Sequence, residues 1–239
     1  MKQIIQRLAN TLGYNIIRRD GCAPDMTSSE RAIHAQVKPY TMTSVERVVC
    51  LIQAVEYIST NNISGDIAEC GVWRGGSMMA VAHKLLELGD TSRTLFLYDT
   101  FQGMPPPTKK DKMSGVLAAE ILEKNNAVKC IADLDDVRRN LLSTNYPPER
   151  LRFIAGKVEE TLPVAKPESL ALLRLDTDWY ESTLCELQHL YPVLTKGGIL
   201  IIDDYGHWEG ARAAVDEFFG AHRPFLHRID YSGRLLIKG

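Results

Sequence analysis

The stretch "LLRLDTDWYEST", residues 172–183, begins as an apolar run and ends with Asp176 and Asp178, which are followed at once by a tryptophan and a tyrosine. A second stretch, "ILIIDDYGHW" at 199–208, repeats this pattern with two further aspartates. Near-continuous apolar runs are typical of strands buried on both faces of a parallel sheet. The two stretches therefore predict neighbouring buried strands that end in acid.

The same kind of run recurs along the chain and alternates with segments of helical periodicity. The apolar runs lie at 66–72, 94–100, 151–158, 170–178 and 198–205, and the helical segments at 77–88, 113–126, 133–144, 180–194 and 209–221. The turn residues Ser232 and Gly233 divide the last stretch into two apolar halves and predict a closing antiparallel hairpin. The pattern predicts an α/β fold with a doubly wound, mostly parallel seven-stranded sheet.

One domain spanning residues 1–239 is expected. Residues 1–43 are interpreted as an N-terminal helix and flap, because 20–43 are polar and rich in turn residues and predict a connector or a flexible flap. Residues 44–239 would form the core, starting with a helix that Ser44 caps. An insertion at 102–150, which carries "GMPPPTKKDK", is interpreted as a lid.

Composition and charge narrow the classes of partner. A chain of 239 residues with a formal net charge of −2 has no long-range attraction for nucleic acid. The first 20 residues have the spacing of an amphipathic helix that packs on the body or on a second subunit, the alternative being binding to a membrane surface. Charges interrupt them too early for a signal peptide or a membrane span. Five scattered cysteines are typical of thiols in a reducing compartment. We expect a cytoplasmic protein with neither a nucleic-acid nor a membrane partner.

The first predicted strand ends in "ECGVWRGGS", a glycine-rich turn that lets a ligand approach the backbone. The second ends in Asp99, at the position where an acid commonly accepts hydrogen bonds from ribose hydroxyls. Because the turn is not GxGxxG and no P-loop is present, a nucleoside cofactor without pyrophosphate fits better than a dinucleotide. The alternative is a set of turn glycines with a capping aspartate.

Three carboxylates, those of Asp176, Asp203 and Asp204, are expected at the ends of two adjacent strands. Such a cluster repels itself unless a cation lies among the carboxylates or one of them is protonated, and Mg²⁺ prefers oxygen ligands. Asp203 and Asp204 can share one ion only if the chain turns there, which Gly206 allows. The alternative is that one of them caps the helix beginning near Glu209.

Asp178 can project beside this trio on the substrate side, where a general base is needed, and His207 is a second candidate for that role. Asp178 could instead cap the helix that starts near Tyr180. Four aromatic residues either line a substrate cleft or pack against the sheet: Trp179, Tyr180, Tyr205 and Trp208.

Five motifs together resemble the macrocin O-methyltransferase family. They are "KPYTMTSVERV" at 38–48, "GDIAECGVWRGGSMMA" at 65–80, "LYDTFQGMPPP" at 97–107, "LLRLDTDWYEST" at 172–183 and "GGILIIDDYGHWEGARAAVDEF" at 197–218. They cover most of residues 38–219 in order, whereas the first 37 residues and the last hairpin carry little of the match.

The resemblance implies a class I, S-adenosylmethionine-dependent and Mg²⁺-dependent enzyme that methylates a sugar hydroxyl on a macrolide- or aminocoumarin-like natural product. It implies Asp176, Asp203 and Asp204 as metal ligands and Asp178 as the base. It also implies contacts to the cofactor from Thr41, Met42, Ser44, Glu69, Gly71, Gly75, Ser77, Asp99, Thr100, Gly156, Lys157 and Asp176. The acceptor would be a small glycosylated molecule, and we expect a homodimer or larger homo-oligomer.

Two other classes of protein remain as alternatives from sequence. An NAD-dependent dehydrogenase or epimerase would use the same glycine-rich turn and ribose acid, but the chain has no Tyr-x-x-x-Lys pair and such an enzyme gives the acids no role. A non-catalytic nucleoside-binding protein would keep the sheet, yet the acids at two strand ends would then cost stability without a ligand.

Overall fold

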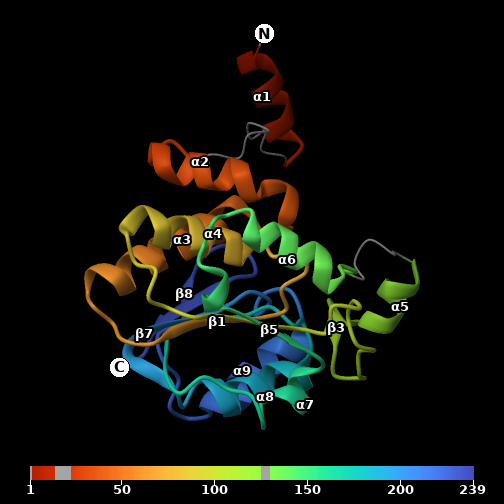
Figure 1. Ribbon diagram of the computed structural model, residues 1–239. Coiled ribbons are helices and arrows are strands. Elements are labelled where there is room, and N and C mark those ends of the chain that lie inside the picture. The colour runs from red at the N-terminus through yellow and green to blue at the C-terminus, as the bar shows by residue number, and fades with distance from the viewer. Residues whose placement is uncertain (1, 14–22, 125–129) are drawn as a thin grey trace.

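The computed structural model describes residues 2–13, 23–124 and 130–239, which form a central sheet with helices on both faces (Figure 1). In the described residues the sheet has seven strands in the order β5-β2-β1-β6-β7-β9-β8. The strands are β1 (Asp66–Cys70), β2 (Leu95–Asp99), β5 (Leu151–Ala155), β6 (Leu170–Leu175), β7 (Leu194–Ile202), β8 (His227–Arg228) and β9 (Arg234–Ile237). The predicted fold class is confirmed.

Strand direction changes only at the end of the chain. β5, β2, β1, β6 and β7 pair in parallel, whereas β9 is antiparallel to both β7 and β8, which confirms the predicted closing hairpin. From β1 the chain builds the sheet first toward β2 and β5, and later in the other direction through β6 and β7. This reversal makes the carboxyl ends of β1 and β6 the place where a ligand crevice is expected.

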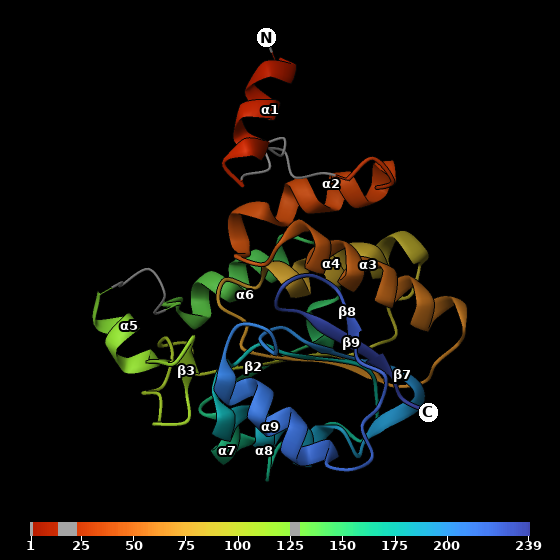
Figure 2. The ribbon, with the colours of Figure 1, turned by 180° about the vertical axis from the view of Figure 1, so that it is seen from behind.

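Helices cover the two faces in two groups (Figures 1 and 2). The first group is α3 (Val45–Thr60), α4 (Gly76–Leu88) and α6 (Leu134–Leu142), and the second is α7 (Val158–Thr161), α8 (Tyr180–Leu190) and α9 (Glu209–Phe219). The strands are apolar on both sides because each face is covered: Leu172 and Ile201 pack in the cluster that contains α3 and α4, and Leu173 and Leu200 in the cluster that contains α8 and α9.

The helix at residues 28–37 was not expected from sequence, and neither was the short helix at Val158–Thr161, which begins within the predicted strand 151–158. Residues 28–37 form α2 (Ser28–Val37), where we predicted a connector or flap, and a short 3₁₀ turn (Lys38–Tyr40) follows it. Thr27 accepts a hydrogen bond from the Glu30 amide, and the Glu30 carboxylate accepts one from the Thr27 amide. The sequence "TSSE" at 27–30 already carries the pattern of this capping box, which favours a helix more strongly than the polar composition favours a connector.

Two predicted helices differ from the observed ones by more than two residues at one end. At the start of the segment predicted as a helix over 113–126, residues 112–117 form a hairpin of β3 (Lys112–Met113) and β4 (Val116–Leu117), and α5 (Ala118–Lys124) starts only after it. Ser114 and Gly115 have φ of 51° and 79°, a turn geometry that a helix does not allow. The predicted residues 125–126 lie outside the described residues. The helix predicted to end at 194 ends at Leu190, because Leu194 already begins β7.

The N-terminal helix, α1 (Lys2–Thr11), lies beyond α2 at the outer end of the molecule (Figures 1 and 2). Its apolar side chains are exposed rather than packed on the body, which corrects one of the two expectations for this helix: Ile4 64%, Ile5 51%, Leu8 61% and Leu12 72%. The rest of the predicted helix, 14–20, lies outside the described residues. In the parts of the chain that are described, the helices are too short or too polar to cross a bilayer.

Candidate active site

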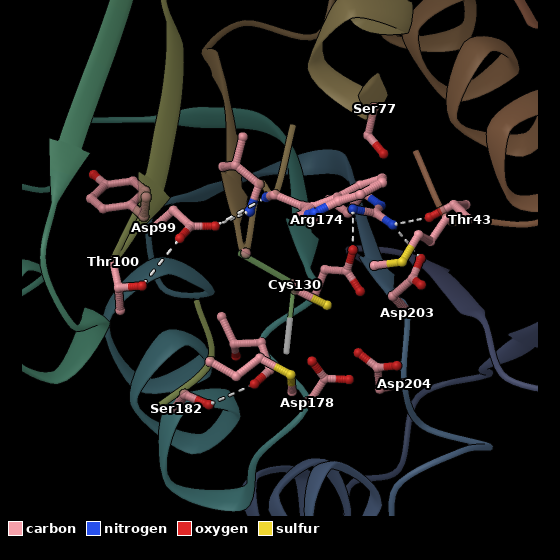
Figure 3. A pocket seen from close by; sticks show the side chains of 18 of the residues that line it. Thr43, Ser77, Asp99, Thr100, Cys130, Arg174, Asp178, Ser182, Asp203 and Asp204 are labelled. Atoms are coloured by element: carbon pink, nitrogen blue, oxygen red, sulfur yellow. Dashed lines mark hydrogen bonds and ion pairs between the residues drawn. The ribbon is translucent and has the colours of Figure 1, made fainter. Parts of the chain in front are cut away.

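A cavity of about 410 Å³ opens at the carboxyl ends of β1, β2, β6 and β7. Its volume is that of a typical small-molecule site. Figure 3 shows Asp99 and Thr100 at one end, Asp203 and Asp204 at the other, and Arg174 between them. The predicted residues that line it are Thr41, Met42, Gly71, Ser77, Asp99, Thr100, Gly156, Lys157, Asp176, Asp178, Asp203 and Asp204.

Gly71 joins the two halves of the site. It has a φ of +81°, and a Cβ at this position would lie 2.0 Å from the carbonyl oxygen of Asp176. The Asp176 amide also donates to the carbonyl of Cys70 at 2.8 Å. The loops after β1 and β6 therefore touch through backbone, and only glycine fits at their contact.

Asp99 ends β2 and is held by the backbone amides around it. Its Oδ2 accepts from Val72 (2.7 Å) and Trp73 (3.1 Å), and its Oδ1 accepts from Phe101 (2.8 Å). Thr100 is fixed by donating its hydroxyl to the carbonyl of Gly103 at 2.6 Å. The carboxylate lines the cavity in one orientation, with lone pairs left for a ligand hydroxyl.

The flap before α3 forms part of the cavity wall. Thr41 and Met42 line the cavity, and Met42 is 56% exposed. Thr43 accepts a hydrogen bond from Arg174 at 2.9 Å. Ser44 does not line the cavity: its hydroxyl caps α3 by accepting from the Arg47 amide, as predicted, and donates to Asp230 at 2.8 Å.

The acidic trio converges as predicted. One carboxylate oxygen from each of Asp176, Asp203 and Asp204 lies within 4.8 Å of the others. Asp204 is 7% exposed, and among the described residues its Oδ2 is buried with no hydrogen-bond partner. A buried carboxylate oxygen without a donor costs free energy that a cation recovers, so the donor set fits a hard divalent ion.

Two arginines lie against this trio, and sequence reasoning missed both. Arg174 is 3% exposed and forms ion pairs with Glu69, with Asp176 (2.8 Å) and with Asp203 (2.6 Å). Arg47 pairs with the other oxygen of Asp203 and with Asp230 (3.0 Å). Part of the positive charge that we assigned to a metal ion is therefore supplied by guanidinium groups.

The pKa values at this end of the site are displaced. Burial raises the pKa of Asp176 and Asp204 well above the usual range; for Asp176 Arg174 opposes the rise, and for Asp204 the neighbouring Asp178 adds to it. Burial also raises the pKa of Glu69 to about 7, although Arg174 opposes it. Burial thus outweighs the two guanidinium groups at these carboxyls, and an added cation would lower these pKa values.

Asp178 adopts a φ of +68° and accepts a hydrogen bond from the indole nitrogen of Trp208 at 2.7 Å. Burial, followed by the charge of Asp176, raises its pKa well above the usual range. It does not cap α8: the Tyr180 amide donates instead to Asp111, at 2.8 Å. Nor do Asp203 or Asp204 cap α9, which within the described chain begins after Trp208 without a side-chain cap.

Two other predicted cofactor residues lie outside the cavity wall. Glu69 is 1% exposed and lies behind the cavity, on Arg174. Gly75 has a φ of +87° and sits at the N-terminus of α4.

The aromatic residues divide between cleft and core. Trp208 and His207 line the cavity, and burial lowers the pKa of His207. Trp179 packs edge-to-face on Trp208 with ring centroids 5.0 Å apart. Tyr180 and Tyr205 point away from the cavity, where their hydroxyls donate to Glu217 and Asp216 on α9.

Fold and site together define an O-methyltransferase of the Rossmann-like class I architecture. The chain belongs to the macrocin O-methyltransferase (TylF) family, whose profile matches residues 2–235. It is therefore an O-methyltransferase, which sets aside the dehydrogenase, epimerase and non-catalytic alternatives.

Three relatives illustrate the similarity. The demethyldecarbamoylnovobiocin O-methyltransferase of Streptomyces niveus is 37% identical over 179 residues, which are 75% of this chain and 67% of the relative. The mycinamicin III 3''-O-methyltransferase of Micromonospora griseorubida is 35% identical over 183 residues, 77% of this chain and 71% of the relative. The solved structure of the O-methyltransferase NovP superimposes with a TM-score of 0.73 at 31% identity, covering 99% of this chain and 97% of that one.

Proposed function

We propose that the protein transfers a methyl group from S-adenosylmethionine to a sugar hydroxyl of a glycosylated natural product, in the presence of Mg²⁺. The observation that carries this proposal is that the acidic trio and Asp178 open into the same cavity as Gly71 and Asp99. Relatives at 35–37% identity are named for methylation of novobiocin and mycinamicin precursors, which supports a macrolide- or aminocoumarin-like acceptor.

At the nucleoside end, the chain offers fixed groups for a cofactor. S-adenosylmethionine, when bound, supplies the methyl group. Asp99 would accept hydrogen bonds from the ribose hydroxyls, because its carboxylate is already oriented by three backbone amides. Gly156 and Lys157, which follow β5, would flank the adenine, and Thr41 and Met42 would close over the cofactor from the flap.

At the acidic end, Asp176, Asp203 and Asp204 would hold the metal ion. A divalent cation, when bound, stabilises negative charge that develops on an acceptor oxygen. Asp204 Oδ2 has the most to gain, since it is buried without a partner in the described structure. Arg174 and Arg47 hold Asp203 from both sides and so keep its carboxylate from rotating.

Asp178 would act as the general base and take the proton from the acceptor hydroxyl. In its ionised form a carboxylate with a raised pKa is a stronger base than an ordinary aspartate, and the indole of Trp208 fixes one of its oxygens. His207 is the less suitable base, because it lies beside Tyr231 toward the exposed side, with 3.3 Å between Nδ1 and the tyrosine hydroxyl.

A labelled-methyl assay tests this function. The protein is incubated with S-adenosylmethionine carrying a labelled methyl group, Mg²⁺, and demethyldecarbamoylnovobiocin or mycinamicin III, together with a panel of other glycosylated natural products. Label is expected in at least one acceptor, at a sugar oxygen. Binding of NAD with no binding of S-adenosylmethionine by calorimetry would contradict the proposal.

We also propose a homo-oligomer, a dimer or larger, of single-domain chains. The exposed apolar side chains of α1 support it, because a helix with one apolar face gains free energy by covering that face. Light scattering of the parent and of Leu8→Glu tests this: the parent is expected to have the mass of an oligomer and the variant a lower mass. A monomeric parent at micromolar concentration would contradict it.

A further inference from the structure

We propose that Asp111 is a positioning residue that fastens the lid segment, defined as residues 102–124, to helix α8 and thereby fixes Asp178. The inference deepens the proposed function and rests on it, since the role of Asp178 as base is part of that function. The lid segment contributes Gly103, Met104 and Pro105 to the cavity wall, so its position also shapes the acceptor side of the site.

Asp111 is a fully buried carboxylate, with 0% of its surface exposed. Its Oδ1 accepts from the backbone amide of Tyr180 at 2.8 Å. Its Oδ2 accepts from the amide and the hydroxyl of Thr108, at 2.7 and 2.9 Å, and its carbonyl accepts from the amide of Ala118 at 2.9 Å. One residue therefore organises the lid segment and joins it to α8.

The N-terminus of α8 needs an acceptor from elsewhere. The first amides of a helix have no partner within the helix, and the residue before α8 is Trp179, whose side chain gives no capping bond in the described structure. A carboxylate at this end also interacts favourably with the helix dipole. Asp111 meets both requirements from a segment about 70 positions earlier in the chain.

Helix α9 leaves room for this contact. Gly210 lies in its first turn, and a Cβ there would be 2.1 Å from Asp111 Oδ1 and 3.1 Å from the Tyr180 nitrogen. Any side chain at position 210 would therefore displace the carboxylate. Gly210 and Asp111 therefore form one junction, in which the glycine leaves the space that the Asp111 carboxylate fills between the lid segment, α8 and α9.

A second chain of contacts leads from the lid segment to the base. The indole nitrogen of Trp179 donates to the carbonyl of Pro105 at 2.9 Å, and its ring packs on Trp208. Trp208 in turn donates to Asp178 at 2.7 Å. Around the two tryptophans, apolar side chains of the lid segment complete a small cluster that includes Ala118, Met113 and Ile121.

Asp178 depends on these contacts because its backbone is strained. A φ of +68° is unfavourable for an aspartate and persists only where the surroundings hold it. It is held on one side by the indole of Trp208 and on the other by α8, which starts two residues later at Tyr180. Release of the lid segment would weaken both supports, whereas Asp99 would keep its three backbone amides, which all lie outside that segment.

The test uses the indole signals of the three tryptophans in ¹⁵N-labelled protein, namely Trp73, Trp179 and Trp208. In Asp111→Ala the signals of Trp179 and Trp208 are expected to shift or broaden, while that of Trp73 stays in place. The matched control is Glu120→Ala, an exposed acid on α5 in the same lid segment, which should leave all three signals unchanged. The spectra of both variants can be recorded without an acceptor substrate.

Limited trypsin digestion gives an independent readout. Lys109 and Lys110 are exposed and directly precede Asp111. Cleavage after them is expected to be about tenfold faster in Asp111→Ala than in the parent or in Glu120→Ala, a factor typical of losing a helix cap when cleavage follows local opening. Asp111→Asn keeps one acceptor oxygen and should give a smaller effect; it supplies the readout if Asp111→Ala does not fold.

A double variant tests the junction itself. Gly210→Ala should by itself reproduce the spectral change of Asp111→Ala, and adding it to Asp111→Ala should have little further effect, because both act on one contact.

Asp111→Ala should also lower turnover with an accepted substrate while the Kd for S-adenosylmethionine is kept. The inference is overturned if indole signals and cleavage rate in Asp111→Ala match those of Glu120→Ala. Failure of the parent to bind S-adenosylmethionine would instead count against the proposed function alone.

Discussion

The two ends of the cavity satisfy their carboxylates in opposite ways. At the nucleoside end, Asp99 is satisfied by three backbone amides and needs no charged partner. At the acidic end, Asp176, Asp203 and Asp204 lie within 4.8 Å of one another, and two arginines provide their only positive charge among the described residues. The carboxylate at the nucleoside end already has its hydrogen-bond donors, whereas the acidic end has an excess of negative charge.

This difference indicates that the nucleoside end of the cavity binds the cofactor and that the acidic end carries out the reaction. Groups that are fully hydrogen-bonded before a ligand arrives hold it in place without rearranging. Carboxylates with raised pKa values and an oxygen without a partner are poised to take up a cation or a proton. We therefore expect substitutions at the nucleoside end to change affinity for the cofactor, and substitutions at the acidic end to change turnover and stability.

The largest effect is expected for the base. Asp178→Asn keeps the size of the side chain and its hydrogen bond from Trp208, but it cannot accept a proton from an acceptor hydroxyl. Turnover should fall by about 10²–10⁴, as is typical for loss of a general base, while calorimetry shows unchanged binding of S-adenosylmethionine. Unchanged turnover would remove Asp178 from this role and leave His207 as the candidate.

The next largest effect is expected on the free energy of unfolding. Arg174→Met removes the guanidinium that Glu69, Asp176 and Asp203 share; it leaves the buried Glu69 without its ion pair, whereas Asp203 keeps Arg47. Urea denaturation should show a loss of about 3–5 kcal/mol in the free energy of unfolding. The control is Arg223→Met, whose arginine is 65% exposed and pairs with Asp216 at 3.3 Å, and which should cost no more than about 1 kcal/mol. Equal losses in the two variants would show that Arg174 does not balance the acidic end.

A pH dependence should come from Glu69. Its pKa is about 7 in the folded protein against an ordinary value of 4.5, so the folded state keeps the proton to higher pH. The stability that this protonation contributes is fully present below pH 4.5 and is lost as the pH rises through 7. The glutamine of Glu69→Gln has no proton to lose in this pH range, so the variant should not show this decline in the free energy of unfolding.

The measurement is the free energy of unfolding of the parent and of Glu69→Gln across that pH range, with EDTA present. The difference between them should move by about 3 kcal/mol in favour of the variant as the pH rises. Exposed Glu149→Gln serves as the control and should track the parent. A constant difference across the range would mean that Arg174 keeps Glu69 ionised at all these pH values.

The smallest effect is expected at the nucleoside end. Asp99→Ala removes an acceptor for the ribose hydroxyls and should weaken binding of S-adenosylmethionine by about 1.5–3 kcal/mol, the usual contribution of hydrogen bonds to a charged group. Calorimetry measures it, with exposed Asp135→Ala as a control. An unchanged Kd in Asp99→Ala would place the ribose elsewhere in the cavity.

The sequence predicts the sheet and the acids well because both follow from local pattern. Apolar runs such as 170–175 can be read one strand at a time, and the carboxyl ends of parallel strands converge by topology. The capping box of α2 was also readable, in "TSSE", but composition masked it. A charged residue inside an apolar run, as Arg174 is in "LLRLD", was a further signal, since a buried guanidinium requires partners.

What could not be predicted depends on contacts between distant segments. Nothing local marks Asp111 as the cap of a helix that starts at Tyr180, or Arg47 as the partner of Asp203 and Asp230. The same holds for Gly210, whose missing side chain matters only because the lid segment lies against it. These contacts join the lid segment to α8 and α9, and α3 to the end of β7 and to the final hairpin.

The central claim is that the excess negative charge at the acidic end holds a divalent cation needed for methyl transfer. It is tested most directly by the rate of labelled-methyl transfer from S-adenosylmethionine to an accepted substrate, with EDTA and then with Mg²⁺ restored. The account predicts loss of transfer in EDTA, full recovery with Mg²⁺ in the parent, and no recovery in Asp204→Ala, whose missing carboxylate includes the oxygen without a partner in the described residues. Full activity of the parent in EDTA would contradict it.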